Sequence, residues 1–111
     1  MEMHDIDIIM VTYNQEAYIK QSIESVLMQE GLISYKLIIC DDCSTDRTGQ
    51  ICISYEKLLP DIIKYIRGDE NVGVAGNYRR AFNACTAKYV AILEGDDFYT
   101  DRYKLKKQIV F

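Results

Sequence analysis

Short apolar segments that resemble buried strands alternate along this chain with segments whose apolar residues recur at helical spacing. The strand-like segments are residues 6–11, 36–40, 62–67 and 89–93. Strands separated by helices predict a parallel sheet whose connections are right-handed crossovers. We therefore predict an α/β fold, a three-layer α/β/α sandwich with a mostly parallel, Rossmann-like sheet. Strands 6–11, 36–40 and 89–93 are expected to be neighbours in that sheet.

Residues that cap or break helices set the expected limits of the first two helices. Asn14 is suited to cap the first helix, and Gly31 is suited to close it. Ser44 or Thr45 is suited to cap the second helix, which Pro60 ends. The apolar residues expected on the buried faces are Ile19, Ile23, Val26 and Leu27 in the first helix, and Ile51, Tyr55, Leu58 and Leu59 in the second.

The second half of the chain predicts a loop followed by a third helix. Residues 68–76 contain three glycines and an asparagine, so we expect them to form a loop. Another helix is expected from Arg102 onward. The apolar face of the third helix is expected to hold Tyr78, Ala81, Phe82 and Cys85.

An apolar strand that leads directly into three carboxylates is the strongest chemical signal in the chain. Residues 90–97 read VAILEGDD, so Glu94, Asp96 and Asp97 follow the last strand at once. Acidic side chains this close repel one another and are costly to desolvate. Mg²⁺ is commonly held by one or two carboxylates together with the phosphates of a substrate. The run therefore indicates a divalent-metal site, with a solvated acidic turn as the alternative.

Two other strands also end in polar residues. The first strand leads into Thr12, Tyr13 and Asn14, and the second leads into Asp41 and Asp42. The carboxyl ends of parallel strands form the ligand-binding edge of an open α/β sheet. We therefore expect the residues that follow the three strands to converge at one edge of the domain, with Tyr13, Asp42 and Asp96 among them.

Composition and charge narrow the class of protein. The chain has 111 residues, which suits one domain, and its formal net charge of −4 argues against a nucleic-acid-binding surface. The N-terminal residues MEMHD do not resemble a signal peptide, so we expect a cytoplasmic protein whose four cysteines stay reduced. The last residues, QIVF, lie within an apolar pattern. We expect residues 1–111 to be a single domain, the truncated N-terminal part of a longer enzyme.

Four short motifs, in order, resemble those of the family 2 glycosyltransferases, which have the GT-A fold. Residues 11–16 read VTYNQE, residues 41–48 read DDCSTDRT, residues 71–73 read NVG and residues 94–97 read EGDD. The resemblance covers nearly the whole chain. It implies transfer of a sugar from a nucleoside diphosphate sugar to an acceptor, with inversion, and usually with Mg²⁺ or Mn²⁺ as cofactor.

The resemblance also assigns roles to the residues that would bind the nucleotide. Tyr13 would stack near the nucleobase, and Asp42 would accept a hydrogen bond from it, typically from the N3–H of uracil. Thr12 and Glu16 belong to the same nucleotide-sugar-binding motif. The chain departs from many members at Cys43, where glycine is frequent, and this departure does not touch the metal chemistry.

Further roles implied by the resemblance concern the diphosphate and the metal. Glu94 would lie near the ribose, and Asp96 would bind the metal that bridges the diphosphate. Asp97 is the alternative metal ligand, because the position of the acidic pair varies by one residue in related sequences. Asn77 and Arg80 would contact the pyrophosphate or the donor sugar. This last assignment is the least constrained, since the segment lacks the Ala-Arg-Asn that many members carry.

The resemblance also implies the class of the donor substrate and the class of the acceptor substrate. The donor is expected to be a UDP-sugar, and the acceptor a glycan, a lipid-linked glycan or another molecule in cell-envelope polysaccharide synthesis. The general base that inversion requires is expected beyond Phe111, so residues 1–111 alone should be inactive. Membrane association, at the inner face of the membrane, is expected only through segments outside this chain.

Two alternative functions remain open from the sequence. Cys40 and Cys43 follow a strand with the spacing of a thioredoxin-like redox site, although the acidic residues between them disfavour a thiolate. The chain could also be a nucleotide-binding module without catalysis. The candidate residues have plainer readings too, in which Tyr13 packs in the interior, Asp42 and Asn77 cap helices, and Arg80 is solvated.

Overall fold

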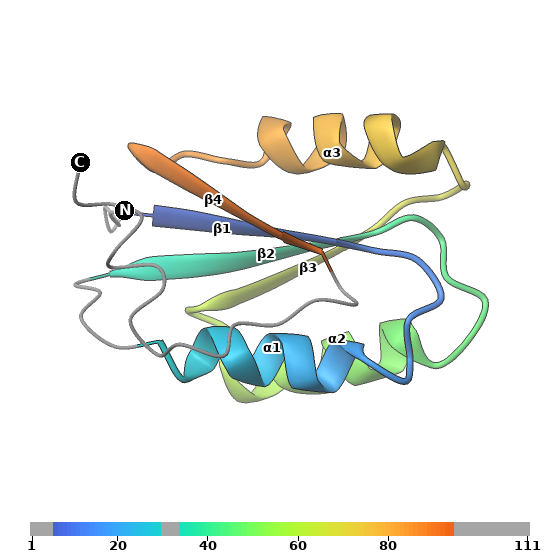
Figure 1. Cartoon of the computed structure of the whole chain (residues 1–111), viewed down its shortest axis with the longest axis horizontal. Helices are drawn as coiled ribbons and strands as arrows, with labels where there is room; N and C mark the ends of the chain where they lie inside the picture. Colours follow the sequence, from blue (N-terminus) through green and yellow to red (C-terminus); the bar gives the residue numbers. More distant parts are fainter. Residues whose placement is uncertain (1–5, 30–33, 95–111) are drawn as a thin grey trace.

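The computed structural model describes residues 6–29 and 34–94, which form a four-stranded parallel sheet with helices on both faces (Figure 1). Helices α1 and α2 cover one face, and α3 covers the other. The predicted three-layer α/β architecture is therefore confirmed. The elements in chain order are β1 (Ile6–Thr12), α1 (Ile19–Leu27), β2 (Tyr35–Asp41), α2 (Thr48–Leu58), β3 (Ile63–Arg67), α3 (Gly73–Asn83) and β4 (Tyr89–Glu94).

The strand order is β3-β2-β1-β4, so the three strands expected to be neighbours lie side by side with β1 between the other two. The register aligns the strand ends, with Thr12 beside Asp41 and Val11 beside Glu94. Asp41 in turn lies beside Arg67 at the end of β3. The polar residues that end the strands are thereby gathered at one edge, at the right of Figure 1.

Alternation along the central strands divides the core into two apolar layers. Side chains of successive strand residues point to opposite faces, so Ile8 and Met10 pack toward α1 and α2, whereas Ile9 and Val11 pack toward α3. All seven residues of β1 are buried, which explains why five of them are apolar, with Asp7 and Thr12 as the exceptions. Each fully buried aliphatic side chain contributes roughly 1.5–3 kcal/mol, so these two layers supply most of the driving force for folding.

The helices begin later or earlier than their local sequence predicts. The first begins at Ile19 rather than directly after Asn14, and the second begins at Thr48 rather than after Ser44 or Thr45. The third begins at Gly73, inside the segment expected to be a loop. Distant side chains, described below, bind the N–H groups that precede these helices, and this pairing is not visible in local spacing.

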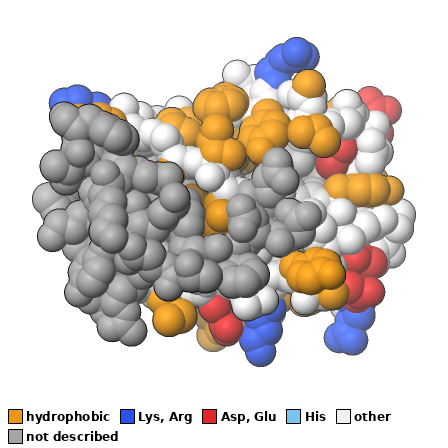
Figure 2. Space-filling view, viewed as in Figure 1, with side chains coloured by type: hydrophobic (Ala, Val, Ile, Leu, Met, Phe, Trp, Pro, Cys, Tyr) orange, Lys and Arg blue, Asp and Glu red, His pale blue; other side chains and the backbone are white. Residues whose placement is uncertain are grey.

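Two apolar residues expected on buried helix faces are exposed instead. Leu58 is 75% exposed and Phe82 is 47% exposed. The buried positions of α3 are Asn77 and Ala81, because the amide of Asn77 is drawn to the sheet by a hydrogen bond from its Nδ2 to the carbonyl of Cys40 (2.9 Å). Figure 2 shows hydrophobic side chains on the surface over α3. Gly31 and the helix expected from Arg102 lie outside the described residues.

The structure also bears on membrane attachment. Among residues 6–29 and 34–94, none of the helices has the length and apolar character that crossing a bilayer requires.

Truncating a buried side chain of α1 should destabilise the protein far more than truncating an exposed one of α2. Ile23 is fully buried, so Ile23→Ala should lower the free energy of unfolding by about 2–5 kcal/mol. Ile53 is 38% exposed, and Ile53→Ala should cost about 1 kcal/mol or less. Urea unfolding of both variants measures the difference. Equal losses would show that α1 does not pack on the sheet as described.

Candidate functional site

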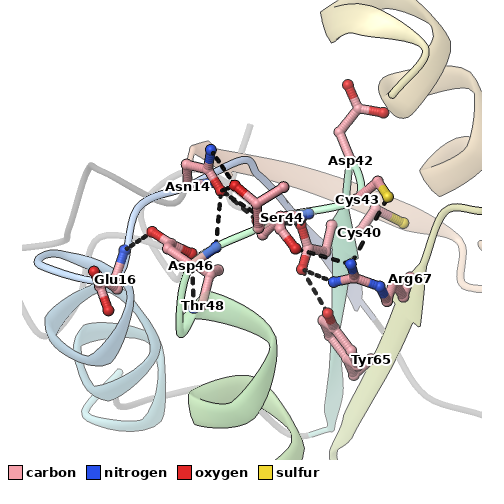
Figure 3. Close-up of polar contacts among 12 residues, drawn as sticks. Asn14, Glu16, Cys40, Asp42, Cys43, Ser44, Asp46, Thr48, Tyr65 and Arg67 are labelled. Atoms are coloured by element: carbon pink, nitrogen blue, oxygen red, sulfur yellow. Dashed lines mark hydrogen bonds and ion pairs between the residues drawn. The ribbon is translucent and has the colours of Figure 1, made fainter. Parts of the chain in front are cut away.

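The loop that follows β1 is cross-linked to the loop that follows β2. The backbone N–H of Asn14 donates to Ser44 Oγ (2.9 Å), and Asn14 Oδ1 accepts from the backbone N–H groups of Thr45 (2.8 Å) and Asp46 (3.3 Å) (Figure 3). Asn14 has a φ of 49°, a left-handed conformation that asparagine tolerates better than most residues. Asn14 therefore joins two loops instead of capping α1.

The same two loops are joined by a second set of contacts near the start of α2. The N–H of Gln15 donates to Thr48 Oγ1 (2.9 Å), and the N–H of Glu16 donates to Asp46 Oδ2 (3.2 Å). Glu16 Oε2 accepts in return from the N–H of Arg47 (3.3 Å). Burial raises the pKa of Asp46, but its hydrogen bonds with Thr48 and Glu16 outweigh that effect and hold the pKa below its ordinary value.

Asp41 is a fully buried carboxylate that anchors the end of β2. It accepts hydrogen bonds from the N–H of Ser44 (3.0 Å) and the hydroxyl of Ser44, and also from the Tyr65 hydroxyl. The Arg67 guanidinium forms an ion pair with it at 3.5 Å. Burial and the hydrogen bond to Asp41 raise the pKa of the Tyr65 hydroxyl, which stays a proton donor. Both carboxylate oxygens therefore have partners, Oδ1 in Ser44 and Oδ2 in Tyr65 and Arg67, which offset the cost of burying the charge.

Asp42 is also buried, but its carboxylate points toward α3 and not toward Asp41's partners (Figure 3). Its two oxygens accept from the N–H of Val72 (2.8 Å) and the N–H of Gly73 (2.9 Å), at the start of α3. Arg80 Nη1 lies 3.9 Å from Asp42 Oδ1. Asp42 therefore does cap a helix, but the helix is α3 rather than the one that follows it in sequence.

A pocket of about 120 Å³ lies between these loops and the start of α3. Its walls are largely apolar, and the carboxylate of Asp42 is its charged group. Tyr13 is 43% exposed, so its ring remains available for stacking. The lining residues are Val11, Thr12, Tyr13, Gln15, Asp42, Val74 and Asn77. A flat heterocycle with an N–H donor fits this combination of apolar walls and one acceptor.

The structure brings four of the predicted site residues to this pocket and leaves others elsewhere. Thr12, Tyr13, Asp42 and Asn77 line it. Arg80 does not line the pocket, but its guanidinium forms an ion pair with the carboxylate of Asp42, which does. The Glu16 side chain accepts a hydrogen bond from the backbone N–H of Arg47, the residue before α2. Sequence reasoning missed Gln15, although it lies within the first motif, and Val74, which sits in the segment expected to be a loop.

The predicted metal ligands Asp96 and Asp97 lie outside the described residues. Within residues 6–29 and 34–94, no group of three side chains that could hold a metal ion is present. The register of β4 does place the backbone of Glu94 beside Val11, which is one of the residues that line the pocket. The donors of the acidic run 94–97 are carboxylate oxygens, which fit a hard divalent cation such as Mg²⁺ or Mn²⁺.

The cysteines do not have the environment of a redox site. Cys40 is buried in the layer under α3, and burial raises the pKa of its thiol to about 11 despite the nearby Arg80. A low thiol pKa is what a reactive cysteine needs. Cys43 has a φ of 66°, and its sulfur lies near Arg67 Nη2 at 3.7 Å. The thioredoxin-like alternative therefore loses its chemical basis.

Comparison with known proteins gives a family match and several close relatives. The model described as Glycosyl transferase family 2 matches residues 7–110. The putative glycosyltransferase EpsE of Bacillus subtilis (strain 168) is 37% identical over 106 residues, covering 96% of this chain and 37% of the relative. The putative teichuronic acid biosynthesis glycosyltransferase TuaG of the same strain is also 37% identical, covering 96% of this chain and 41% of the relative.

Solved structures share the fold. S. aureus TarS 1–349 in complex with UDP has a TM-score of 0.83 at 27% identity, over 95% of this chain and 31% of that one. The mannosyltransferase PcManGT from Pyrobaculum calidifontis, in complex with GDP-Man and Mn²⁺, has a TM-score of 0.88 at 21% identity, over 97% and 32%. These chains and the two curated relatives are therefore matched over only 31% to 41% of their length.

The left-handed conformation at Cys43 yields a stability test of the turn that presents Asp42. A β-branched side chain is strongly disfavoured at positive φ, so Cys43→Val should lower the free energy of unfolding by about 1–2 kcal/mol. Cys43→Gly relieves the strain and should match or exceed the wild-type stability within about 1 kcal/mol. Thermal and urea unfolding measure both variants. A valine variant as stable as the glycine variant would contradict the assigned backbone conformation.

Proposed function

This chain belongs to glycosyl transferase family 2, and from that membership we propose that its protein transfers a sugar from a nucleoside diphosphate sugar, with inversion, to a cell-envelope glycan acceptor. The observation that carries the proposal is the pocket in which Tyr13 and Asp42 meet at the carboxyl edge of the sheet. We further propose that the nucleotide is uridine diphosphate.

The pocket has the chemistry that a pyrimidine base requires. The exposed ring of Tyr13 offers a stacking surface, and the apolar side chains of Val11 and Val74 line the same space. Asp42 offers a charged acceptor for a ring N–H such as N3–H of uracil, and hydrogen bonds to charged groups are the stronger ones. In support, TarS, at 27% identity, has been solved with UDP and with UDP-GlcNAc.

The diphosphate of the donor would extend from this pocket toward the end of β4. Glu94 ends that strand beside Val11, and Asp96 and Asp97 follow it in sequence. We propose that Asp96, with Asp97 as the alternative, holds Mg²⁺ or Mn²⁺. When bound, such an ion stabilises the negative charge that develops on the departing diphosphate. The chain's own contribution would be to fix the base and to hold the metal beside the diphosphate through these carboxylates.

The class of acceptor is proposed from the relatives. TuaG carries a name in teichuronic acid biosynthesis, and GgaB, at 30% identity, is a minor teichoic acid biosynthesis protein of Bacillus subtilis (strain 168). Both names refer to polymers of the cell envelope. We therefore propose a growing or lipid-linked envelope glycan as the acceptor, which the protein would bind with segments other than the nucleotide pocket.

Removing the charge of Asp42 should weaken nucleotide binding. Because Asp42→Asn keeps the shape but replaces one acceptor oxygen by a donor, we expect the Kd for UDP to rise about tenfold or more. Asp69→Asn changes an exposed carboxylate of a neighbouring loop and should leave the Kd unchanged. Isothermal titration with UDP, with and without Mn²⁺, measures both variants, and thermal unfolding checks the fold. An unchanged UDP affinity in Asp42→Asn would overturn the proposed pocket.

The metal assignment is tested by activity in the full-length protein. Asp96→Asn should nearly abolish sugar transfer while leaving the fold intact, a loss of roughly several kcal/mol of transition-state stabilisation. Asp97→Asn should cost less, and Cys43→Ser should be nearly silent. Steady-state kinetics with a UDP-sugar, repeated with a chelator, give the comparison. A Cys43→Ser variant that loses activity while Asp96→Asn keeps it would refute the glycosyltransferase mechanism proposed above.

A further inference from the structure

Two polar side chains of α3, Asn77 and Arg80, connect the carboxylate of Asp42, which faces the pocket, to the backbone of β2. Asn77 is buried, and its Nδ2 donates to the carbonyl of Cys40 (2.9 Å). Its Oδ1 accepts from Arg80 Nη1 (2.9 Å), and the same Nη1 lies 3.9 Å from Asp42 Oδ1. This connection therefore runs from the backbone of β2 through α3 and back to the residue that follows β2.

The guanidinium of Arg80 sits in a space that only glycine at position 68 leaves open. A Cβ placed on Gly68 would lie 2.4 Å from Arg80 Nη1 and 2.6 Å from the other two guanidinium atoms nearest to it. The Arg80 side chain is only 24% exposed. By contrast Arg79, the preceding residue of α3, is exposed. Arg80 is thus an inward-facing arginine with a prepared position, and Arg79 is an outward-facing one on the same helix.

Arg80 acts on the pocket without lining it. The residues that line the pocket include Asp42 and Asn77 but not Arg80. An ionised carboxylate has about four lone-pair positions, and the N–H groups of Val72 and Gly73 occupy one on each oxygen of Asp42. The two N–H groups and the guanidinium 3.9 Å from Oδ1 fix the plane of the carboxylate, which leaves a lone pair free for a ligand donor.

We propose that Arg80 is a positioning residue that sets the preference of this pocket for uracil over cytosine by holding the Asp42 carboxylate correctly oriented. The inference rests on the proposed function, because it takes the pocket to be the nucleobase site. The two pyrimidines have the same ring size but differ at N3, where uracil carries a donor and cytosine carries an acceptor. An oriented carboxylate accepts from the first and repels the lone pair of the second.

The test compares UDP with CDP on the full-length protein and three variants. Arg80→Gln removes the positive charge of the guanidinium. Gly68→Ala keeps that charge but displaces the guanidinium from its position. The matched control is Arg79→Gln, which removes a charge from the exposed side of the same helix. We expect Arg80→Gln and Gly68→Ala to weaken UDP binding about tenfold and to change CDP binding little, so that the ratio of the two Kd values collapses. Arg79→Gln should keep the wild-type ratio. Isothermal titration gives the four ratios, and thermal unfolding follows stability.

Each outcome separates this inference from the proposed function. If the wild type prefers UDP and both Arg80→Gln and Gly68→Ala keep that preference, the positioning role is wrong while the nucleotide pocket stands. Equal losses for UDP and CDP would show that Arg80 only supports the fold, which also overturns the inference. A wild type that binds neither nucleotide, or that prefers CDP, refutes the uridine assignment itself. Loss of discrimination in both variants, with the control unchanged, supports the role of Arg80.

Discussion

Two adjacent carboxylates at the end of β2 are buried toward different neighbours, and the loops of the site are organised around them. Asp41 is compensated by Ser44, Tyr65 and Arg67, whereas Asp42 is compensated by the start of α3 and by Arg80. Leaving one such charge without partners would cost several kcal/mol. The fold therefore has to bring the ends of β2 and β3, the loop that follows β2 and the N-terminus of α3 together at this edge.

This arrangement makes one residue serve stability and binding at once. The carboxylate of Asp42 accepts hydrogen bonds from the backbone N–H groups of Val72 and Gly73 at the start of α3. The same carboxylate faces the pocket beside Tyr13. The neighbouring loops are held by the bonds of Asn14 to Thr45 and Asp46, so the wall of the pocket is largely preformed. A preformed wall reduces the ordering that a ligand would otherwise have to impose.

The strands and the sheet could be predicted from the sequence, because they depend on the periodicity of apolar residues. The start and the rotation of α3 could not, because they depend on hydrogen bonds between residues far apart in the chain. The apolar runs and their helical spacers predicted a parallel sheet in which β1, β2 and β4 are neighbours, and the polar strand ends predicted that Tyr13 and Asp42 share one edge. The start of α3 was missed because its cap comes from Asp42, about thirty residues earlier in the chain. Phe82 was misplaced because a buried Asn77, rather than the most apolar face, sets the rotation of that helix.

The position of β1 has a consequence for how the chain is made. This wholly buried strand pairs on one side with β2, but its other side pairs with β4, which is synthesised last among the described elements. At ordinary translation speeds the interval between the emergence of β2 and that of β4 is on the order of seconds. During that interval the isoleucine-rich edge of β1 is open to pairing with other chains. That edge is closed only after residue 94 has left the ribosome and β4 has paired with β1.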